Sequence, residues 1–285
     1  MTTRTIASPS FIRTIAGLTL TALVAAVPHA AIAQDCTPDP AITTITPGTL
    51  TAAGVVFPPV FDYADGVPSG IEGEVIRIIA DELCLKLQVN MVSGEGVIPA
   101  VQAGRADVAV GGWSRTAARS ELVGLSHPLY LNPVGLISKT GETDLTKLEG
   151  IVATPTGNSW IPEVQALIGD RLRLYQSFPD MYADLEVGRI TQAIVLYNQA
   201  GVRFKERPVE GLKLARMDAD PRISVADPRA QVGFPYIKDA EALGNAMNAV
   251  IDRLVADGTM ADILDRNGFP RDSAEVGEPY LTGQK

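Results

Sequence analysis

Short apolar segments alternate with amphipathic helical segments along most of the chain. One helical face is formed by Val75, Ile76, Ile79, Ala80 and Leu83, and another by Leu243, Met247, Val250, Ile251 and Leu254. Apolar positions three and four residues apart are typical of a helix that packs on a core by one face. Strands that alternate with such helices predict the α/β class, with mainly parallel sheets covered by helices.

A helix, a Gly-Arg pair and a strand occur twice in the same order. The segments are 97–103, Gly104-Arg105 and 107–110 in the first copy, and 181–187, Gly188-Arg189 and 193–196 in the second. No low-complexity linker separates the copies. A chain of this length suits two domains of ordinary size, so we expect two similar α/β lobes.

Residues 1–33 have the features of a cleaved signal peptide. Arg4 and Arg13 precede an apolar run over 15–27, and Ala31-Ile32-Ala33 has the small-x-small pattern that signal peptidase reads. The run is shorter than the roughly 20 residues of a membrane span, and no later segment approaches that length. We therefore expect a periplasmic product without membrane insertion.

Cys36 and Cys84 are the two cysteines of the chain. Cys36 follows Ala33-Gln34-Asp35 rather than a lipobox-like sequence, so we do not expect a lipid anchor. In an oxidising compartment the pair is a candidate disulfide; the alternative is a buried free Cys84 and an exposed Cys36. With His127 as the one histidine after the leader, we expect neither a metal nor another cofactor.

Removal of residues 1–33 leaves 22 basic and 33 acidic side chains, a net charge of −11. Such an acidic chain is a poor partner for nucleic acid or for an anionic membrane. A single arginine in a pocket still suffices to bind an anion. We expect a monomer whose partners are a small molecule and another protein.

The strand over 108–110 leads into a glycine-rich turn, which places Ser114 and Arg119 at its carboxyl end. Arginine offers a planar set of donors matched to a carboxylate, and Ser114 and the Gly112 amide can add single hydrogen bonds. The turn is therefore a candidate carboxylate site. The alternative is a surface arginine in a loop.

In open α/β sheets, ligands bind beyond the carboxyl ends of the strands. The segments expected there are 56–63, 111–119, 155–160 and 197–198. Ser159 is predicted to be the N-cap of a helix that continues through Leu167, and free amides at such a helix start attract anions. Ser159 is thus a helix cap or a ligand contact.

A series of short motifs follows the order and spacing of one protein family. The motifs are Pro58-Pro59-Val60-Phe61-Asp62-Tyr63, Gly70-Ile71-Glu72-Gly73-Glu74-Val75, Ile98-Pro99-Ala100, Gly104-Arg105-Ala106-Asp107, Thr116-Ala117-Ala118-Arg119, Leu125-Ser126-His127-Pro128-Leu129-Tyr130, the segment 145–150 and Ala256-Asp257-Gly258-Thr259-Met260. With them the chain resembles the periplasmic solute-binding proteins of polar amino-acid ABC transporters.

The resemblance implies a type II periplasmic-binding-protein fold, in which two lobes joined by a two-stranded hinge close on a ligand. Lobe 1 is expected over 34–137 plus 231–285, and lobe 2 over 138–230. The implied function is to capture a small carboxylate-bearing ligand, such as an amino acid, a modified amino acid or a related organic acid. The closed protein would deliver it to an ABC permease.

The resemblance also implies a set of ligand-binding residues. They are Arg119 for the α-carboxylate, with Ser114 and Gly112 beside it, Asn158 and Ser159 from lobe 2, and Phe57 against the ligand side chain. The family's aspartate for the α-ammonium falls on Leu196 or Tyr197, and neither carries a negative charge. A standard amino-acid pose is therefore in doubt.

Several other positions bear on the ligand. Gly54 occupies an acidic position of basic-amino-acid binders, which argues against lysine or arginine, and Gly94 replaces a second aromatic, which predicts extra room. Tyr197 is expected to offer its hydroxyl or a cation–π contact. Glu95 and Asn198 are alternative partners for an ammonium group. Trp113 and Trp160 are expected to pack the lobes rather than to contact the ligand.

Two other functions fit the same resemblance. Some proteins of this fold are enzymes, such as cyclohexadienyl and arogenate dehydratases, and Glu72, Glu74 and Glu95 are the acids available for catalysis. An accessory protein that docks a periplasmic dehydrogenase or a sensor would also tolerate the loss of the ammonium site. We expect binding without catalysis.

Overall fold

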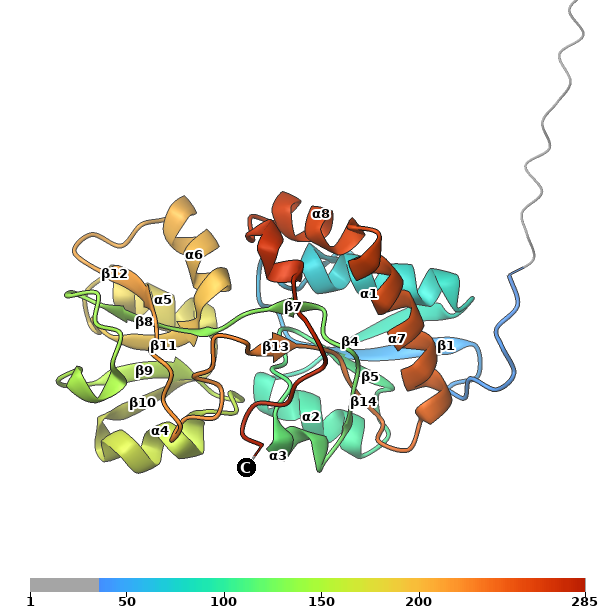
Figure 1. The fold of residues 1–285 in the computed structure, drawn as a ribbon, viewed down its shortest axis with the longest axis horizontal. Helices are drawn as coiled ribbons and strands as arrows, with labels where there is room; N and C mark the ends of the chain where they lie inside the picture. Colours follow the sequence, from blue (N-terminus) through green and yellow to red (C-terminus); the bar gives the residue numbers. More distant parts are fainter. Residues whose placement is uncertain (1–35, 285) are drawn as a thin grey trace, which may run out of the picture. The chain divides into compact units, whose positions relative to one another are not determined.

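The computed structural model describes residues 36–284, which form two five-stranded sheets flanked by helices (Figure 1). The first sheet has the order β4 (Lys86–Met91), β1 (Thr49–Gly54), β5 (Val108–Val110), β14 (Pro235–Tyr236) and β6 (Gly124–Leu125). The second has the order β10 (Leu172–Tyr175), β9 (Val152–Pro155), β11 (Ala193–Leu196), β8 (Val134–Ser138) and β12 (Lys213–Arg216). The predicted two-lobed α/β fold is confirmed.

Each sheet has a parallel part and an antiparallel part. In the first, β4, β1 and β5 are parallel and β14 is antiparallel to β5; in the second, β10, β9 and β11 are parallel and β8 is antiparallel to β11. The sheets are thus mixed rather than mainly parallel. The antiparallel strands arise where the chain passes between the lobes and returns.

The helices bury the faces that the apolar spacing predicted. They are α1 (Gly70–Glu82), α2 (Gly94–Gln102), α3 (Ala117–Ser120), α4 (Ile161–Ile168), α5 (Phe178–Glu186), α6 (Tyr197–Glu206), α7 (Glu241–Ala256) and α8 (Thr259–Arg266). A hairpin of β2 (Asp62–Ala64) and β3 (Val67–Ser69) precedes α1, and short 3-10 turns lie at Leu145–Lys147, Gly169–Arg171 and Arg271–Ala274. Val75 and Ile79 of α1 and Met247 and Ile251 of α7 are fully buried in one core. Among residues 36–284, no helix is long and apolar enough to cross a membrane.

The repeated helix–strand unit occupies the same place in both sheets. α2 leads into β5, the third strand of the parallel series β4-β1-β5, and α5 leads into β11, the third strand of β10-β9-β11. The two predicted copies are therefore equivalent in topology. Their strand ends are the positions at which a ligand site is expected in each sheet.

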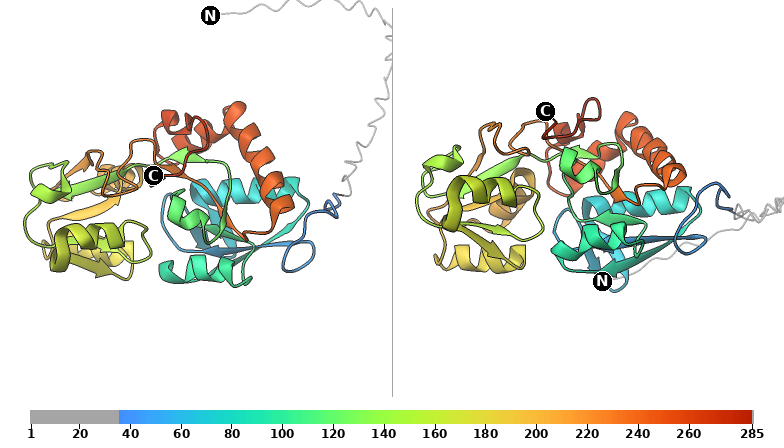
Figure 2. Two further views of the ribbon diagram at one scale, coloured as in Figure 1. Left: turned by 60° about the horizontal axis from the view of Figure 1, so that its bottom comes forward. Right: turned by 90° about the horizontal axis from the view of Figure 1, so that it is seen from below.

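Two antiparallel strands join the lobes. β7 (Tyr130–Leu131) pairs with β13 (Gln231–Val232), and both lie between the two sheets in Figure 1. The expected lobe boundary after residue 137 falls inside β8, whose residues all pair with strands of the second sheet. Sheet membership therefore changes after β7. The C-terminal segment runs past this hinge (Figure 2), where Val276 and Glu278 accept hydrogen bonds from Gln231.

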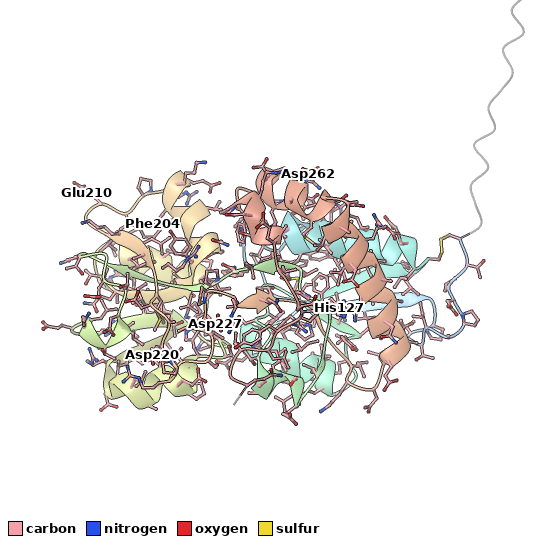
Figure 3. The ribbon with its side chains drawn as sticks, viewed as in Figure 1. His127, Phe204, Glu210, Asp220, Asp227 and Asp262 are labelled. Atoms are coloured by element: carbon pink, nitrogen blue, oxygen red, sulfur yellow. A yellow bond between two sulfur atoms is a disulfide. The ribbon has the colours of Figure 1, made fainter. Side chains whose placement is uncertain are left out.

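Cys36 and Cys84 form a disulfide at the start of the described chain, with their Cα atoms 5.3 Å apart (Figure 3). Cys84 comes just after the C-terminal end of α1, so the bond ties residue 36 to the first lobe. The expected signal peptide, residues 1–33, lies outside the described residues.

Candidate functional site

A cavity of about 70 Å³ lies between loops from both sheets. Its wall is formed by Val55, Val56, Phe57, Gly94, Gly111, Gly112, Trp113, Ser114, Arg119, Pro155, Thr156, Gly157, Asn158, Ser159, Trp160, Gln176, Ser177, Phe178 and Leu196. Three of the four strand-end segments expected at the site contribute to it. The segment 176–178, which follows β10, was not predicted although it also follows a strand of the parallel series.

Arg119 is a buried cation in this wall. It lies in the short helix α3, whose N-cap Thr116 accepts a hydrogen bond from the Arg119 N–H at 3.1 Å. Its guanidinium donates to the Ser114 carbonyl and lies over the Trp113 ring, 5.2 Å from the centroid. Burial lowers the pKa of Arg119 to about 10, so the side chain remains charged at neutral pH.

No carboxylate within residues 36–284 forms an ion pair with Arg119. A buried charge without a partner is costly, and proteins retain such a group mainly where it serves a function. The Trp113 indole N–H is also buried, with no hydrogen-bond partner in the described part of the chain. This wall therefore offers hydrogen-bond donors and positive charge to an anion.

The turn before Arg119 requires glycine at two positions. Gly111 and Gly112 have φ angles of 124° and 85°, which residues other than glycine rarely adopt. A Cβ atom on Gly111 would lie 2.6 Å from Val55 Cγ1, and one on Gly112 would lie 3.0 Å from the Phe57 ring. The close packing of the turn on Val55 and Phe57 thus depends on the two glycines.

Glu72 binds the backbone amides of this turn. Its fully buried carboxyl group accepts hydrogen bonds from the Gly111 N–H at 2.6 Å, the Gly112 N–H at 3.0 Å and the Tyr130 hydroxyl at 2.9 Å. Burial raises the pKa of Glu72 to about 7, although these hydrogen bonds act to lower it. The Gly112 amide therefore has a protein partner, where we expected it to bind the ligand.

We did not predict from the sequence that Glu72 binds the glycine turn. A signal was present, because Glu72 lies four and seven residues before Ile76 and Ile79 and so shares their buried helical face. A charged residue on an apolar face needs a partner. Here the partners are two backbone amides, which no side-chain pattern reveals.

The second sheet contributes Asn158, Ser159 and Trp160. Helix α4 begins at Ile161 with Trp160 as its N-cap residue, so Ser159 is not the cap that we predicted; it lines the cavity. The Asn158 side chain donates to the Pro155 carbonyl at 2.8 Å, and Trp160 Nε1 donates to Thr154 Oγ1 at 3.0 Å. Trp160 is buried and packs the lobe, as expected, although it also reaches the wall.

Aromatic and backbone contacts close the cavity between the lobes. Phe57 stacks on Phe178 with ring centroids 4.2 Å apart, so the ring expected to cover a ligand side chain has a protein partner. A Cβ atom on Gly157 would lie 3.0 Å from backbone atoms of Gly94. The space predicted at Gly94 is thus taken by the backbone of the other lobe.

Tyr197 does not line the cavity, contrary to our expectation. Its ring lies beneath the Arg216 guanidinium, 5.2 Å from centroid to Cζ, and its N–H donates to the Pro133 carbonyl at 2.7 Å. The preceding residue, Leu196, lines the cavity instead. Asn198, an alternative ammonium partner, donates its side-chain amide to Leu131 and Ser273 and also lies outside the wall.

The wall holds no carboxylate from the described residues. Glu95 is exposed outside it, and Glu74 pairs with Arg266 and Asn267. No group of three or more histidine, cysteine or acidic side chains that could bind a metal ion occurs within residues 36–284.

Known proteins share this fold and sequence pattern. The "Probable amino-acid-binding protein YxeM" of Bacillus subtilis is 23% identical over 225 residues, which cover 75% of this chain and 81% of the relative. The amino acid ABC transporter substrate-binding protein AbpA of Streptococcus pneumoniae, solved with L-arginine, superposes with a TM-score of 0.68 at 22% identity, covering 80% of this chain and 96% of that one.

A second similar structure is the ancestral amino-acid-binding protein AncCDT-1, described as a precursor of cyclohexadienyl dehydratase. Its TM-score is 0.65 at 19% identity, with 78% of this chain and 95% of that chain covered. At such identities the structural likeness shows the fold alone. Residues 51–269, most of the chain, match the bacterial extracellular solute-binding proteins, family 3, and the chain belongs to that family.

Proposed function

We propose that this protein captures a small carboxylate-bearing solute between its two lobes in the periplasm and delivers it to an ABC permease. The observation that carries the proposal is Arg119, a buried guanidinium in the cavity wall without an ion-pair partner in the described chain. A ligand carboxylate would supply the missing negative charge and accept hydrogen bonds in a planar arrangement.

Hinge closure fits two contacts between the lobes. Phe57 stacks on Phe178, and Gln199 of α6 donates to the Pro58 carbonyl at 2.9 Å, so each contact joins the first lobe to the second. A ligand held by Arg119 from one lobe and by Ser159 from the other would favour this closed arrangement through its differential affinity. The names of YxeM and AbpA support transport of an amino acid or a related solute.

Binding without catalysis is favoured by the placement of the acids. Glu72 is occupied by two amides and a hydroxyl, Glu74 is paired with Arg266, and Glu95 lies outside the wall. A dehydratase needs a proton donor or acceptor within hydrogen-bond reach of its substrate. None of these three carboxyl groups meets that requirement in the cavity.

The proposal is tested by thermal unfolding of the mature protein with L-amino acids, with matched carboxylates that lack the amine, and with the primary amides of the stabilising compounds. A native-state ligand raises Tm. We expect a carboxylate, but not its amide, to raise Tm in the wild type and not in Arg119→Met. Arg216→Met is the matched control, because Arg216 faces Tyr197 outside the cavity, and it should behave as the wild type.

An equal rise in Tm for Arg119→Met would overturn the carboxylate site. If no compound stabilises the wild type, capture of a small carboxylate is contradicted and the accessory role is favoured.

A further inference from the structure

The cavity wall carries a single charged side chain among the described residues, that of Arg119. A carboxylate without other charges would neutralise it. An α-amino acid would bring an ammonium group as well, and a buried cation needs a negative or strongly accepting partner. The identity of the residues that could supply this partner therefore decides the ligand class.

Three carboxylates near the wall are not placed to bind an ammonium group. Glu72 lies behind Gly111 and Gly112 and accepts their amides. Glu95 and Asp180, next to the wall residues of α2 and α5, have exposed side chains, and the Asp180 carboxylate accepts a hydrogen bond from Ser177 at 2.7 Å. None of the three lines the cavity.

The end of β11 presents an apolar side chain to the cavity. Leu196 is 2% exposed and lines the wall, whereas Tyr197 begins α6 and turns toward Arg216. The Leu196 side chain thus supplies methyl groups and no acceptor for an ammonium group. An aliphatic or oxygen-substituted ligand fits beside Leu196 without a buried unpaired charge.

The cavity is also small. Ligand pockets commonly measure roughly 300–1,000 Å³, whereas this cavity measures about 70 Å³. The Phe57–Phe178 stack and the close approach of Gly157 to Gly94 limit extension of a side chain. Larger ligands would require these contacts to separate.

From charge, wall and size we infer that the ligand is a short carboxylate without an α-amine, such as a 2-hydroxy or 2-oxo acid of three or four carbons. This inference rests on the proposed function. Arg119 binds the carboxylate, and the hydroxyl groups of Ser114, Thr156 and Ser159 in the same wall are available to the oxygen at carbon 2. Leu196 contacts the short carbon chain.

The test is isothermal titration of the mature protein with L-lactate, D-lactate and pyruvate against L-alanine and D-alanine. Lactate and alanine have the same number of non-hydrogen atoms and differ in the amine. We expect lactate or pyruvate to bind at least about 10-fold more tightly than either alanine. The pair L-leucine and 2-hydroxyisocaproate, titrated in parallel, tests size, and both should bind more weakly than the three-carbon acid.

Leu196→Asp should reverse the preference toward alanine, because it adds a negative charge to the wall. Leu196→Asn, which is isosteric but uncharged, is the matched control and should not reverse it. If Leu196→Asp fails to fold by circular dichroism, the wild-type comparison of lactate with alanine decides the question alone.

The possible failures are distinguishable. If alanine, leucine or another amino acid binds more tightly than its amine-free partner and this binding is lost in Arg119→Met, the inference is overturned while the proposed function stands. Tighter binding of 2-hydroxyisocaproate than of lactate overturns the size limit. If no compound binds in an Arg119-dependent manner, the proposed function itself has failed.

Discussion

The two lobes contain equivalent strand ends that have different chemistry. After β5 the chain passes through Gly111 and Gly112 before α3, and the guanidinium of Arg119 is left without an acidic partner in the cavity wall. After β11 the chain enters α6 at once, and its first amides donate to the Pro133 carbonyl and to Asn132 Oδ1. The segment after β5 therefore supplies polar donors to the ligand cavity, whereas the end of β11 presents the apolar Leu196 to it and the segment that follows supports the hinge.

The difference shows that topology alone does not assign function to a strand end. A turn that extends beyond its strand places donors in the cavity, whereas a helix that starts directly commits its first amides to neighbouring backbone and side chains. In the first lobe the Arg119 guanidinium lowers the free energy of unfolding, because it is a buried charge without an acidic partner in the cavity wall.

The largest effect is expected from Arg119→Met. Binding of a carboxylate should weaken on the order of 100-fold or more, since the ligand would be left as an unpaired buried anion. Without ligand, the free energy of unfolding should rise by about 1–3 kcal/mol, because the variant removes a buried cation that has no ion-pair partner among the described residues. Urea unfolding and titration calorimetry measure the two quantities.

Arg115→Met is the matched control, because Arg115 is a buried arginine of the same turn that has partners. It donates to the Ser126 and Tyr280 carbonyls and to Gln231 Oε1. Its removal should lower the free energy of unfolding by about 2–4 kcal/mol, since these acceptors lose their donors. If both variants were destabilised alike, the contrast between Arg115, with three hydrogen-bond acceptors, and Arg119, with the Ser114 carbonyl as its acceptor, would be wrong.

The next effect concerns the pH dependence of Glu72. Its pKa rises from 4.5 in the unfolded chain to about 7 in the fold, so between these values the folded state binds the proton more tightly. The resulting stabilisation is complete below pH 4.5 and is lost as the pH rises through about 7, with a size of about 3 kcal/mol.

Glu72→Gln removes this titration while it keeps one acceptor for the glycine amides. We subtract the unfolding free energy of the variant from that of the wild type, both measured in urea. This difference should decrease by about 3 kcal/mol between pH 4.5 and pH 8, because only the wild type loses stability as Glu72 ionises. A difference that stays constant across this range would show that Glu72 does not titrate there.

A smaller effect is expected on the hinge side, from Asn198→Ala. The variant leaves the Leu131 carbonyl and the Ser273 hydroxyl without the Asn198 amide. The free energy of unfolding should fall by about 1–2 kcal/mol, and intrinsic affinity for a carboxylate should change less than threefold. A loss of binding comparable to that of Arg119→Met would mean that Asn198 also contacts the ligand.

The smallest effect is expected from Tyr197→Phe. Because the ring faces Arg216 and not the cavity, removal of the hydroxyl should leave carboxylate affinity within about twofold and stability within about 0.5 kcal/mol. Titration calorimetry provides the check. A tenfold loss of affinity would return Tyr197 to the site.

The sequence alone determined the α/β alternation, the repeated helix–strand unit and the glycine turn that leads to Arg119. These features depend on local spacing, since apolar periodicity and strand-to-helix order are properties of neighbouring residues. The positions of Ser114 and Ser159 in the wall were also accessible, because both follow predicted strands. The prediction of Ser159 as the helix cap was wrong, because Trp160 is the N-cap residue and helix α4 begins at Ile161.

Only the tertiary structure decided which of these residues face the cavity. Leu196 and Tyr197 are adjacent, and adjacent side chains at a strand end point to opposite sides, so a shift of one residue exchanges their roles. The stack of Phe57 on Phe178 and the bond from the Gly112 amide to Glu72 join segments far apart in the chain. Such contacts depend on how the two lobes pack and on how helix α1, which carries Glu72, packs against the glycine turn. Local spacing does not contain that information.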